Sequence, residues 1–232
     1  MFARLVIFST ASINFPCSLR ATCRAIPRLE SGGSPLVALN LTKNRSREYY
    51  VINAFVRSVK MKIFIASDIH GSEHYCKIMA EKYREESADK LLLLGDLLYH
   101  GPRNDLPLVY NPKGVIAILN SLKNEIICVR GNCDTEVDQM VLDFPIMAEY
   151  AIIYDGNKTI YATHGHKFNP QNPPMLKSGD ILLNGHTHIP ANEAFGEFYY
   201  VNPGSVSIPK NGSNHSYMIY ENGKFTLKNL CD

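Results

Sequence analysis

Five short apolar runs between residues 63 and 185 each lead into Asp, Asn or His residues beside a glycine. The runs are found in "IASDIH", "LLLLGD", "CVRGN", "YATHGH" and "LLNGHTH". The polar residues that follow them are Asp68, His70, Asp96, Asn132, His164, His186 and His188. The runs have the length and borders of buried strands, and ligands in α/β sheets gather outside the carboxyl ends of strands. We therefore expect these polar side chains to lie together at one edge of a sheet.

Each of these strand ends, taken alone, has an ordinary structural explanation. Asn and Asp favour turns, and a lone histidine is more often a surface or core residue than a ligand. The ordinary explanation must hold independently at five successive strand ends, whereas one metal centre accounts for all of them. The neighbouring glycines allow sharp turns and a close approach of the backbone to ions or substrate. These are Gly71, Gly95, Gly131, Gly165 and Gly185.

The number and type of donors predict two metal ions. Two aspartates, one asparagine carbonyl and four histidine nitrogens are too many ligands for a single tetrahedral zinc, but they fit two ions that share one bridging carboxylate. Mixed nitrogen and oxygen donors without thiolate favour Mn, Fe, Zn or Co over Ca or Cu(I).

Residues 61–232 alternate between strands and helices at first and continue mainly as strands. Apolar residues recur at helical spacing over 74–87 and again from Pro112, where Asn111 is expected to be the N-cap. The last two strands are expected to form a hairpin through Asn222-Gly223. Helices early and strands late predict an α/β protein with more than one sheet layer.

Residues 1–60 form an N-terminal extension of different composition, with nine Lys or Arg against Glu30 and Glu48. Three interpretations are open: a start-site artefact with the natural start at Met61, a targeting peptide, or a genuine appendage, and a disordered segment is expected. In each case the chemistry begins at Met61, directly before the strand of "MKIFIASDIHGS".

Composition excludes several classes of protein. The hydrophobic content of 45% is that of a globular protein, and no run approaches the length of a membrane span. The overall net charge is +2 and the extension carries +7, so residues 61–232 carry −5 and no nucleic-acid stripe. The six cysteines show neither CxxC pairing nor regular spacing, which favours a reducing compartment such as the cytoplasm.

The ordered set D-x-H, G-D, G-N-x-D, H-G-H and G-H-T-H resembles the calcineurin-like metallophosphoesterase superfamily. The stretches "LLYHGPRN", "VRGNCDTEVDQM" and "NPGSVSIPK" are similar to those of its bacterial YfcE-type phosphodiesterases. The resemblance covers about residues 61–230. It implies an α/β (α+β) fold of two packed mixed β-sheets flanked by helices, with a metallophosphoesterase domain over 61–232.

The resemblance also implies a role for each strand-end residue. Asp68, His70 and His188 would hold a first metal, Asn132, His164 and His186 a second, and Asp96 would bridge them. Two divalent ions about 3.5–4 Å apart produce hydroxide from a bridging water and clamp phosphoryl oxygens. The implied function is a hydrolase, a phosphodiesterase acting on small phosphodiesters with manganese as the expected ion and Zn²⁺, Fe²⁺, Co²⁺ or Mg²⁺ as alternatives.

One position departs from the family pattern. Many members carry a histidine directly after the motif asparagine, and this chain has Cys133 there. A thiol is a poorer hydrogen-bond partner than imidazole, so Cys133 fits a space-filling or cleft-shaping role better than proton donation. His100 and His166 lie near the ligands in sequence and are candidates for the substrate or leaving-group side, whereas His74 and His215 are expected at the surface.

Three rival functions remain. The same centre could act on phosphomonoesters, including phosphoproteins, or the domain could be a non-catalytic scaffold, because a retromer scaffold subunit resembles this superfamily. The acidic balance of 61–232 works against a nuclease. The physiological substrate, the metal and the oligomeric state stay open, since the apolar C-terminal strands could serve self-association or the core.

Overall fold

The computed structural model describes residues 3–6, 37–43, 50–56 and 61–231, with side chains described only from residue 61 onward. The chain divides into two compact units, Met1–Val59 and Lys60–Asp232. In the first unit, β1 (Ala3–Val6), β3 (Tyr50–Val56) and β2 (Val37–Lys43) form an antiparallel sheet in that order. The expectation of a disordered extension or start-site artefact falls largely on residues outside the described ranges, and it stays a prediction.

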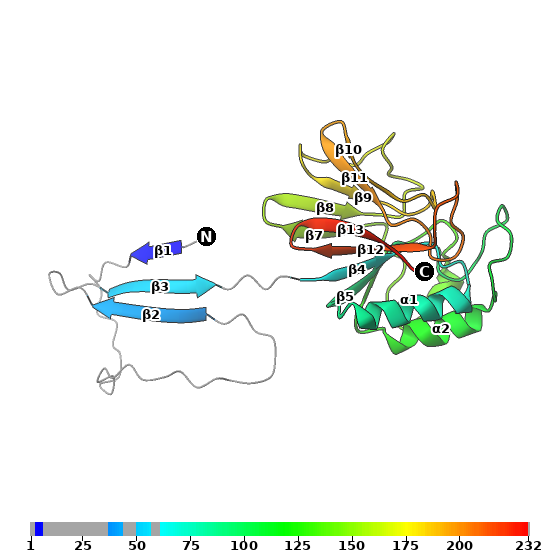
Figure 1. The fold of residues 1–232 in the computed structure, drawn as a ribbon, viewed down its shortest axis with the longest axis horizontal. Coiled ribbons are helices and arrows are strands. Elements are labelled where there is room, and N and C mark those ends of the chain that lie inside the picture. The colour runs from blue at the N-terminus through cyan, green and yellow to red at the C-terminus, as the bar shows by residue number, and fades with distance from the viewer. Residues whose placement is uncertain (1–2, 7–36, 44–49, 57–60, 232) are drawn as a thin grey trace. The chain divides into compact units, whose positions relative to one another are not determined.

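The second unit contains two five-stranded sheets (Figure 1). One sheet has the order β13 (Lys224–Asn229), β12 (Ser216–Glu221), β4 (Ile63–Ala66), β5 (Lys90–Leu93), β6 (Ile126–Cys128). The other has the order β10 (Ala191–Phe195), β11 (Phe198–Asn202), β9 (Ile181–Leu183), β8 (Lys158–Ala162), β7 (Ala151–Asp155). Both sheets mix parallel and antiparallel pairs, so the predicted fold of two packed mixed sheets is confirmed.

Alternation along the strands separates two apolar cores. In β4, Ile63 and Ile65 belong to the core between the sheets, while Phe64 and Ala66 belong to the core under the helices. The helices α1 (Glu73–Glu85) and α2 (Pro112–Ser121) cover the outer face of the β4–β5 sheet (Figure 1). The layers are therefore the helices, the sheet that contains β4 and β5, and the sheet that contains β8 and β9, and the two sheets pack face to face.

Helix α1 agrees with the prediction, and its start is explained by Ser72, whose hydroxyl accepts the amide N–H of Tyr75 at 3.4 Å. Helix α2 begins at Pro112 and Asn111 occupies the N-cap position, both as predicted. The side chain of Asn111 makes no capping hydrogen bond and instead donates to the Glu73 carboxylate at 2.7 Å. A tertiary partner on α1 therefore replaces the local cap.

The predicted hairpin is confirmed, because β12 and β13 pair antiparallel and turn through Asn222 and Gly223, both with positive φ. Strand β10 was not predicted, since its four residues from Asn192 to Phe195 are all exposed and show no apolar alternation. The short helix α3 (Glu136–Gln139) was also missed. Within the described part of the chain, no helix is long and apolar enough to cross a bilayer.

Candidate metal centre

The strand-end residues converge from both sheets. The strands β4, β5 and β6 are parallel neighbours in one sheet, and β8 and β9 are parallel neighbours in the other. Their carboxyl ends therefore meet at one edge of the sandwich, as expected. This edge brings together Asp68, His70, Asp96, Asn132, His164, His186 and His188.

Asp68, His70 and His188 form the first group of candidate ligands. The Nε2 atoms of His70 and His188 lie 3.2 Å apart. Asp68 Oδ1 lies 3.3 Å from Nε2 of His188 and 3.5 Å from Nε2 of His70. All three side chains are buried, so these donor atoms face one another without solvent around them.

Asn132, His164 and His186 form the second group. His164 Nε2 lies 3.0 Å from Asn132 Oδ1 and 3.2 Å from His186 Nδ1. Asp96 Oδ2 lies 3.4 Å from Nε2 of His164 and 3.8 Å from Nε2 of His70, so it faces both groups. This is the position of the residue expected to bridge.

Backbone carbonyl groups fix the orientation of three of the histidine rings. The Nδ1 atoms of His70, His164 and His188 lie 2.8, 2.7 and 2.6 Å from carbonyl oxygens. The carbonyls belong to Tyr99, Leu94 and Ile208 respectively. A neutral ring that donates through Nδ1 leaves Nε2 as an unprotonated acceptor, as in histidines that bind metals.

The donor set fits divalent cations. In the neutral tautomer, Nε2 of His70 and Nε2 of His188 are two acceptors facing each other, and no proton lies between them to join them. Asp68 Oδ1 is buried and has no hydrogen-bond partner among the described residues. A cation among these atoms would satisfy all of them, because acceptors of this kind are the ligands of Mn, Fe and Zn.

The backbone is strained at the same place. Nine non-glycine residues in the described part of the chain have positive φ, and five of them are candidate ligands. These are Asp68, His70, Asp96, His186 and His188, with φ between 49° and 67°. Such conformations persist only where surrounding contacts hold them, and they cluster at functional sites.

Two glycines let the loops of the centre approach one another. A Cβ on Gly131 would lie 2.1 Å from Asp96 Oδ1, and one on Gly185 would lie 1.9 Å from the Ser67 hydroxyl. Any larger residue would displace the loops that carry Asp96 and Asp68.

The aspartates of the centre are ionised. Burial alone would raise the pKa of Asp68, but the neighbouring His188 and His70, whose Nε2 atoms lie 3.3 and 3.5 Å from Oδ1, hold it well below its ordinary value. Burial likewise opposes ionisation of Asp96, and His164 outweighs it and lowers the pKa of Asp96. Burial and the nearby His164 lower the pKa of His186 to about 4, so this imidazole is a neutral acceptor at neutral pH. Two carboxylates in a desolvated place attract cations.

Several residues that support the centre were missed by sequence reasoning. The hydroxyls of Ser205 and Ser207 donate to the Asp68 carbonyl oxygen at 2.9 and 3.0 Å. Asn202 donates to the Gly185 carbonyl at 2.8 Å and so holds the loop that carries His186. The signal was present in "NPGSVSIPK", whose resemblance was noted without a role, because which turn it supports depends on the tertiary fold.

Cys133, His100 and His166 lie beside the centre. The Sγ atom of Cys133 is within 4.8 Å of ligand atoms of His70 and Asp96. Burial, followed by the neighbouring Asp96, raises the pKa of the Cys133 thiol to about 12. The Nδ1 atoms of His100 and His166 are buried and have no partner among the described residues. The His166 ring lies 5.5 Å from that of His164, and the His100 ring packs edge-on against Tyr110.

The other histidines are separate from the centre. His74 is exposed, as expected. The expected surface position of His215 was wrong, because this ring is partly buried, stacks on Tyr75 and donates from Nδ1 to the Val206 carbonyl at 2.8 Å. Its place in the sequence between polar residues hid a packing role that depends on helix α1.

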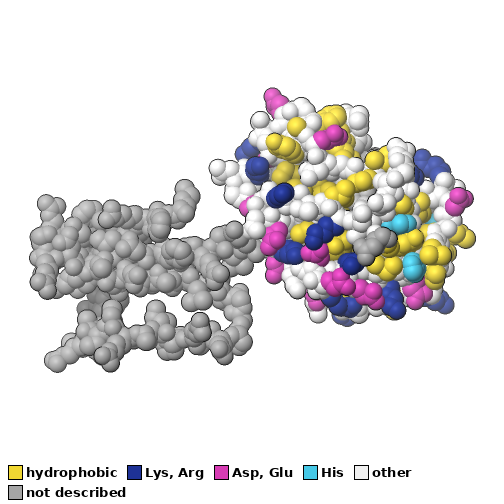
Figure 2. Space-filling view, viewed as in Figure 1, with side chains coloured by type: hydrophobic (Ala, Val, Ile, Leu, Met, Phe, Trp, Pro, Cys, Tyr) yellow, Lys and Arg dark blue, Asp and Glu magenta, His cyan; other side chains and the backbone are white. Residues whose placement is uncertain are grey.

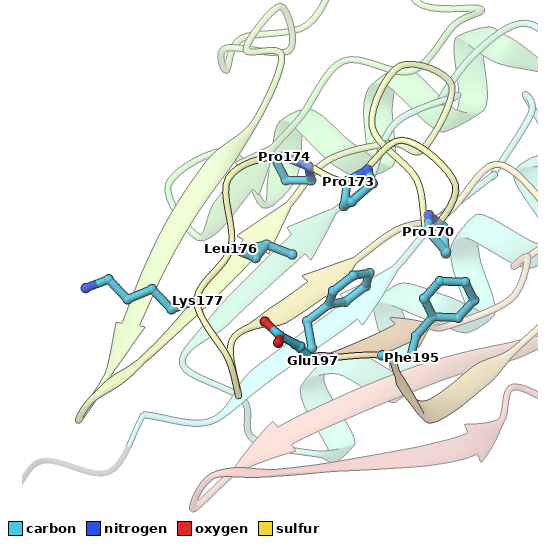
Figure 3. Close-up of a pocket in the computed structure, with 9 residues that line it drawn as sticks. Pro170, Pro173, Pro174, Leu176, Lys177, Phe195 and Glu197 are labelled. Carbon is cyan, nitrogen blue, oxygen red and sulfur yellow. The ribbon is translucent and has the colours of Figure 1, made fainter.

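A groove of about 370 Å³ lies at the edge of the second sheet (Figure 3). Its walls are the proline-rich loop after His166 and the β10–β11 hairpin, and its lining includes Pro170, Pro173, Pro174, Leu176, Phe195 and Phe198. None of its lining residues belongs to the candidate metal centre. On the face in Figure 2, cationic and anionic side chains of residues 61–231 are interspersed with apolar ones.

Known proteins share this fold and these motifs. Residues 61–224 match the calcineurin-like phosphoesterase superfamily domain. The chain is 46% identical to phosphodiesterase YfcE of Escherichia coli over 172 residues, which cover 74% of this chain and 94% of that protein. The solved structure of the E. coli phosphoesterase YfcE superposes with a TM-score of 0.72 over 73% of this chain and 93% of that one. The probable metallophosphoesterase YsnB of Bacillus subtilis is 25% identical over 72% of this chain and 89% of its own. The resemblance expected from the motifs is confirmed.

Proposed function

The chain belongs to the calcineurin-like phosphoesterase superfamily and is a phosphoesterase, and from this premise we propose that it hydrolyses small phosphodiesters at a centre of two divalent ions. The proposal for diesters rests on the 46% identity to phosphodiesterase YfcE. The proposal for two ions rests on the two groups of donor atoms that share Asp96.

One observation carries the metal proposal. Asp68 Oδ1 is buried, has no hydrogen-bond partner in the part of the chain that the structure describes, and lies within 3.5 Å of two ring nitrogens that carbonyl groups orient as acceptors. We propose that Asp68, His70 and His188 hold one ion and that Asn132, His164 and His186 hold the other. When bound, such ions activate a water molecule for attack on phosphorus and neutralise charge on the phosphoryl oxygens.

The remaining residues act by orientation and by excluding water. The carbonyls that accept from Nδ1 keep Nε2 of His70, His164 and His188 turned inward. The serine hydroxyls at the Asp68 carbonyl hold that residue in its left-handed conformation. This preorganisation means that the donor atoms need little rearrangement when ions and substrate arrive.

On the substrate side we propose that His100, His166 and Cys133 contact the ester. The two histidines each have a buried Nδ1 without a partner among the described residues, and a phosphoryl or ester oxygen would complete their hydrogen bonding. Cys133 remains a neutral thiol and shapes the cleft, and no nucleophilic side chain is required. The His100→Ala and His166→Ala variants should bind metal normally and lose rate on the diester, and unchanged rates would remove these residues from the site.

Manganese is the proposed ion, the cytoplasm the proposed compartment, and a small diester the proposed partner. Zn²⁺, Fe²⁺, Co²⁺ and Mg²⁺ suit the same donor types, so the ion must be found by measurement.

The test is hydrolysis of an aryl phosphodiester and the matched aryl monoester by protein stripped of metal and refilled with Mn²⁺, Zn²⁺ or Mg²⁺. We expect metal-dependent activity that favours the diester. A preference for the monoester would assign a phosphomonoesterase. Two bound ions per chain without activity on either ester would point to a scaffold, and failure to bind any ion would refute the centre.

A further inference from the structure

Asp134 is a buried carboxylate that lies outside both groups of candidate ligands. Its residue is 1% exposed. Its Oδ2 accepts the backbone N–H groups of Asp96 and Gly131, both at 2.8 Å, and its Oδ1 accepts the N–H of Leu97 at 2.9 Å. Both oxygens are thus occupied as acceptors of backbone N–H groups, and among the described residues no hydrogen bond or ion pair joins them to a candidate ligand side chain.

These bonds join two separate loops. Asp96 and Leu97 follow β5, whereas Gly131 and Asp134 itself follow β6. The connection is reciprocal, because Asp96 Oδ1 accepts the N–H of Cys133 at 2.7 Å. Two aspartates, one from each loop, therefore hold each other's backbone.

The hydrogen bonds that join the loop of Asp96 to the loop of Asp134, which we call the clamp, determine which oxygen Asp96 offers to the centre. Since Oδ1 of Asp96 is held by the Cys133 amide, only Oδ2 faces His70 and His164. The backbone of Asp96 is in the left-handed conformation, with φ of 55°, and the hydrogen bond from its own N–H to Asp134 stabilises it there.

We propose that Asp134 is a positioning residue of the metal centre: it holds the Asp96 backbone and the loop of Asn132 so that a single oxygen of Asp96 serves both groups of ligands. This inference rests on the proposed function, because it assigns Asp134 a role in metal binding. Asp134 touches neither ion nor substrate and acts through Asp96.

Asp138 supplies a matched control on the same segment. Its carboxylate also accepts from a backbone N–H, that of Thr135 at 2.7 Å, and from the Thr135 hydroxyl at 2.9 Å. These bonds cap the short helix α3, and among the described residues no hydrogen bond joins the Asp138 side chain to Asp96, Leu97 or Gly131. Removing charge and acceptors there disturbs the local fold and leaves the clamp intact.

The experiment compares full-length wild type with Asp134→Asn, Asp134→Ala and Asp138→Asn. Manganese binding is followed by titration calorimetry, the manganese pair by its exchange-coupled electron paramagnetic resonance signal, and diester hydrolysis by kcat and KM. Residues that orient metal ligands typically contribute about 10–100-fold to metal affinity, so Asp134→Asn should weaken Mn²⁺ binding about 10-fold or more. Asp134→Ala, which has no acceptor left, should weaken it further. KM for the diester should change little, because Asp134 does not touch substrate.

The outcomes separate this inference from the proposed function. Two Mn²⁺ ions in wild type with weaker, uncoupled binding in Asp134→Asn and normal binding in Asp138→Asn would support the inference. A folded Asp134→Asn with wild-type affinity and signal would overturn it while leaving the function intact. Equal losses in both Asn variants, or loss of folding in Asp134→Asn at 25 °C, would also overturn it, since Asp134 would then serve the fold in general. Wild type that binds no Mn²⁺ would overturn both.

Discussion

Two clusters of polar side chains in residues 61–231 differ in whether each buried carboxylate has hydrogen-bond donors around it. In the Glu86 cluster, which joins α1 to β4, β12 and β13, the Glu86 carboxylate accepts from Lys62, Tyr217 and Lys228 at 2.8, 3.0 and 2.5 Å. At the candidate metal centre, Asp68 Oδ1 has no donor among the described residues and faces ring nitrogens that are themselves acceptors. The first cluster is complete within the protein, whereas the second leaves a buried carboxylate oxygen without a hydrogen-bond donor among the described residues.

The difference separates a polar group that stabilises the fold from one that is kept for a ligand. Glu86 lies in ordinary helical backbone, with φ of −69°, whereas both aspartates of the centre are held at positive φ. Strain and unmatched acceptors lower stability unless a bound ion compensates for them. Substitutions at the two clusters should therefore have opposite consequences for activity and stability.

The largest effect is expected from Asp68→Asn. The amide keeps one oxygen, but it removes a negative charge and a metal donor, so the activity on an aryl diester should fall by more than about 100-fold, beyond the usual effect of residues that only orient ligands. The folded state should persist, because the amide oxygen can still accept the His186 N–H that Asp68 Oδ2 accepts in wild type. Rates and thermal unfolding of the metal-free protein measure both effects, and near-normal activity would mean that Asp68 is no ligand.

Gly131→Ala should be the next largest. The φ angle of Gly131 is not in the left-handed region and so permits alanine, but the new Cβ would lie 2.1 Å from Asp96 Oδ1 and 2.3 Å from the Asp96 backbone nitrogen. We expect about a 10–100-fold loss of metal affinity, as for other disturbances of ligand orientation. Gly156→Ala is the control: its site is open, although its φ is +60°, so it should lower stability by about 1 kcal/mol and leave metal binding unchanged. Equal metal affinity in both variants would contradict the close fit at Asp96.

Glu86→Gln tests the other cluster. Burial alone would raise the pKa of Glu86, but Lys228, Lys62 and Tyr217 lower it to about 2. A carboxyl group with a lowered pKa in the folded state contributes stability that is present above its unfolded pKa of about 4.3 and is lost as the pH falls toward 2. At pH 7 the variant should be less stable by about 1–3 kcal/mol, the usual contribution of hydrogen bonds to charged groups.

The pH profile makes this prediction specific. The difference in unfolding free energy between wild type and Glu86→Gln should be constant from pH 7 to about pH 5 and shrink between about pH 4.3 and pH 2, where Glu86 becomes protonated in both states. Denaturant unfolding at several pH values measures it. The activity of the folded variant should equal that of wild type. If the folded variant lost activity, Glu86 would also affect the metal centre, and the two clusters would not differ in function.

The smallest effect is expected from Ser207→Ala. This variant removes one of the two hydroxyls at the Asp68 carbonyl and leaves that of Ser205, which also accepts the Ile208 amide. One neutral hydrogen bond contributes about 0.5–1.5 kcal/mol, so the rate or metal affinity should fall only a few-fold. Ser121→Ala, whose exposed hydroxyl bonds the Ile118 carbonyl at the end of α2, should leave both unchanged. A loss as large as that of Asp68→Asn would show that the loop, rather than the carboxylate, limits the centre.

Sequence patterns predicted the elements whose signals are local. Helix α1 and the β12–β13 hairpin follow from apolar spacing and from Asn222-Gly223. Strand β10 could not be found, because an exposed edge strand has no buried face to create alternation. Asn111 shows that a local signal can also be overridden by the tertiary structure. Its residue type suits a capping hydrogen bond, but its side chain donates to Glu73 of another helix.

The sequence by itself determined which residues can bind metal, because ligand chemistry belongs to each side chain and the endings of five strands repeat it. Only the tertiary structure decided which oxygen each aspartate offers. Asp96 Oδ1 is held by the Cys133 amide, Asp68 Oδ2 by the His186 amide, and Asp134 ties the loops together. These contacts join residues 37 to 118 positions apart: the bonds between the Asp96 and Asp134 loops need β5 and β6 to pair, and the bond between Asp68 and His186 needs the two sheets to pack.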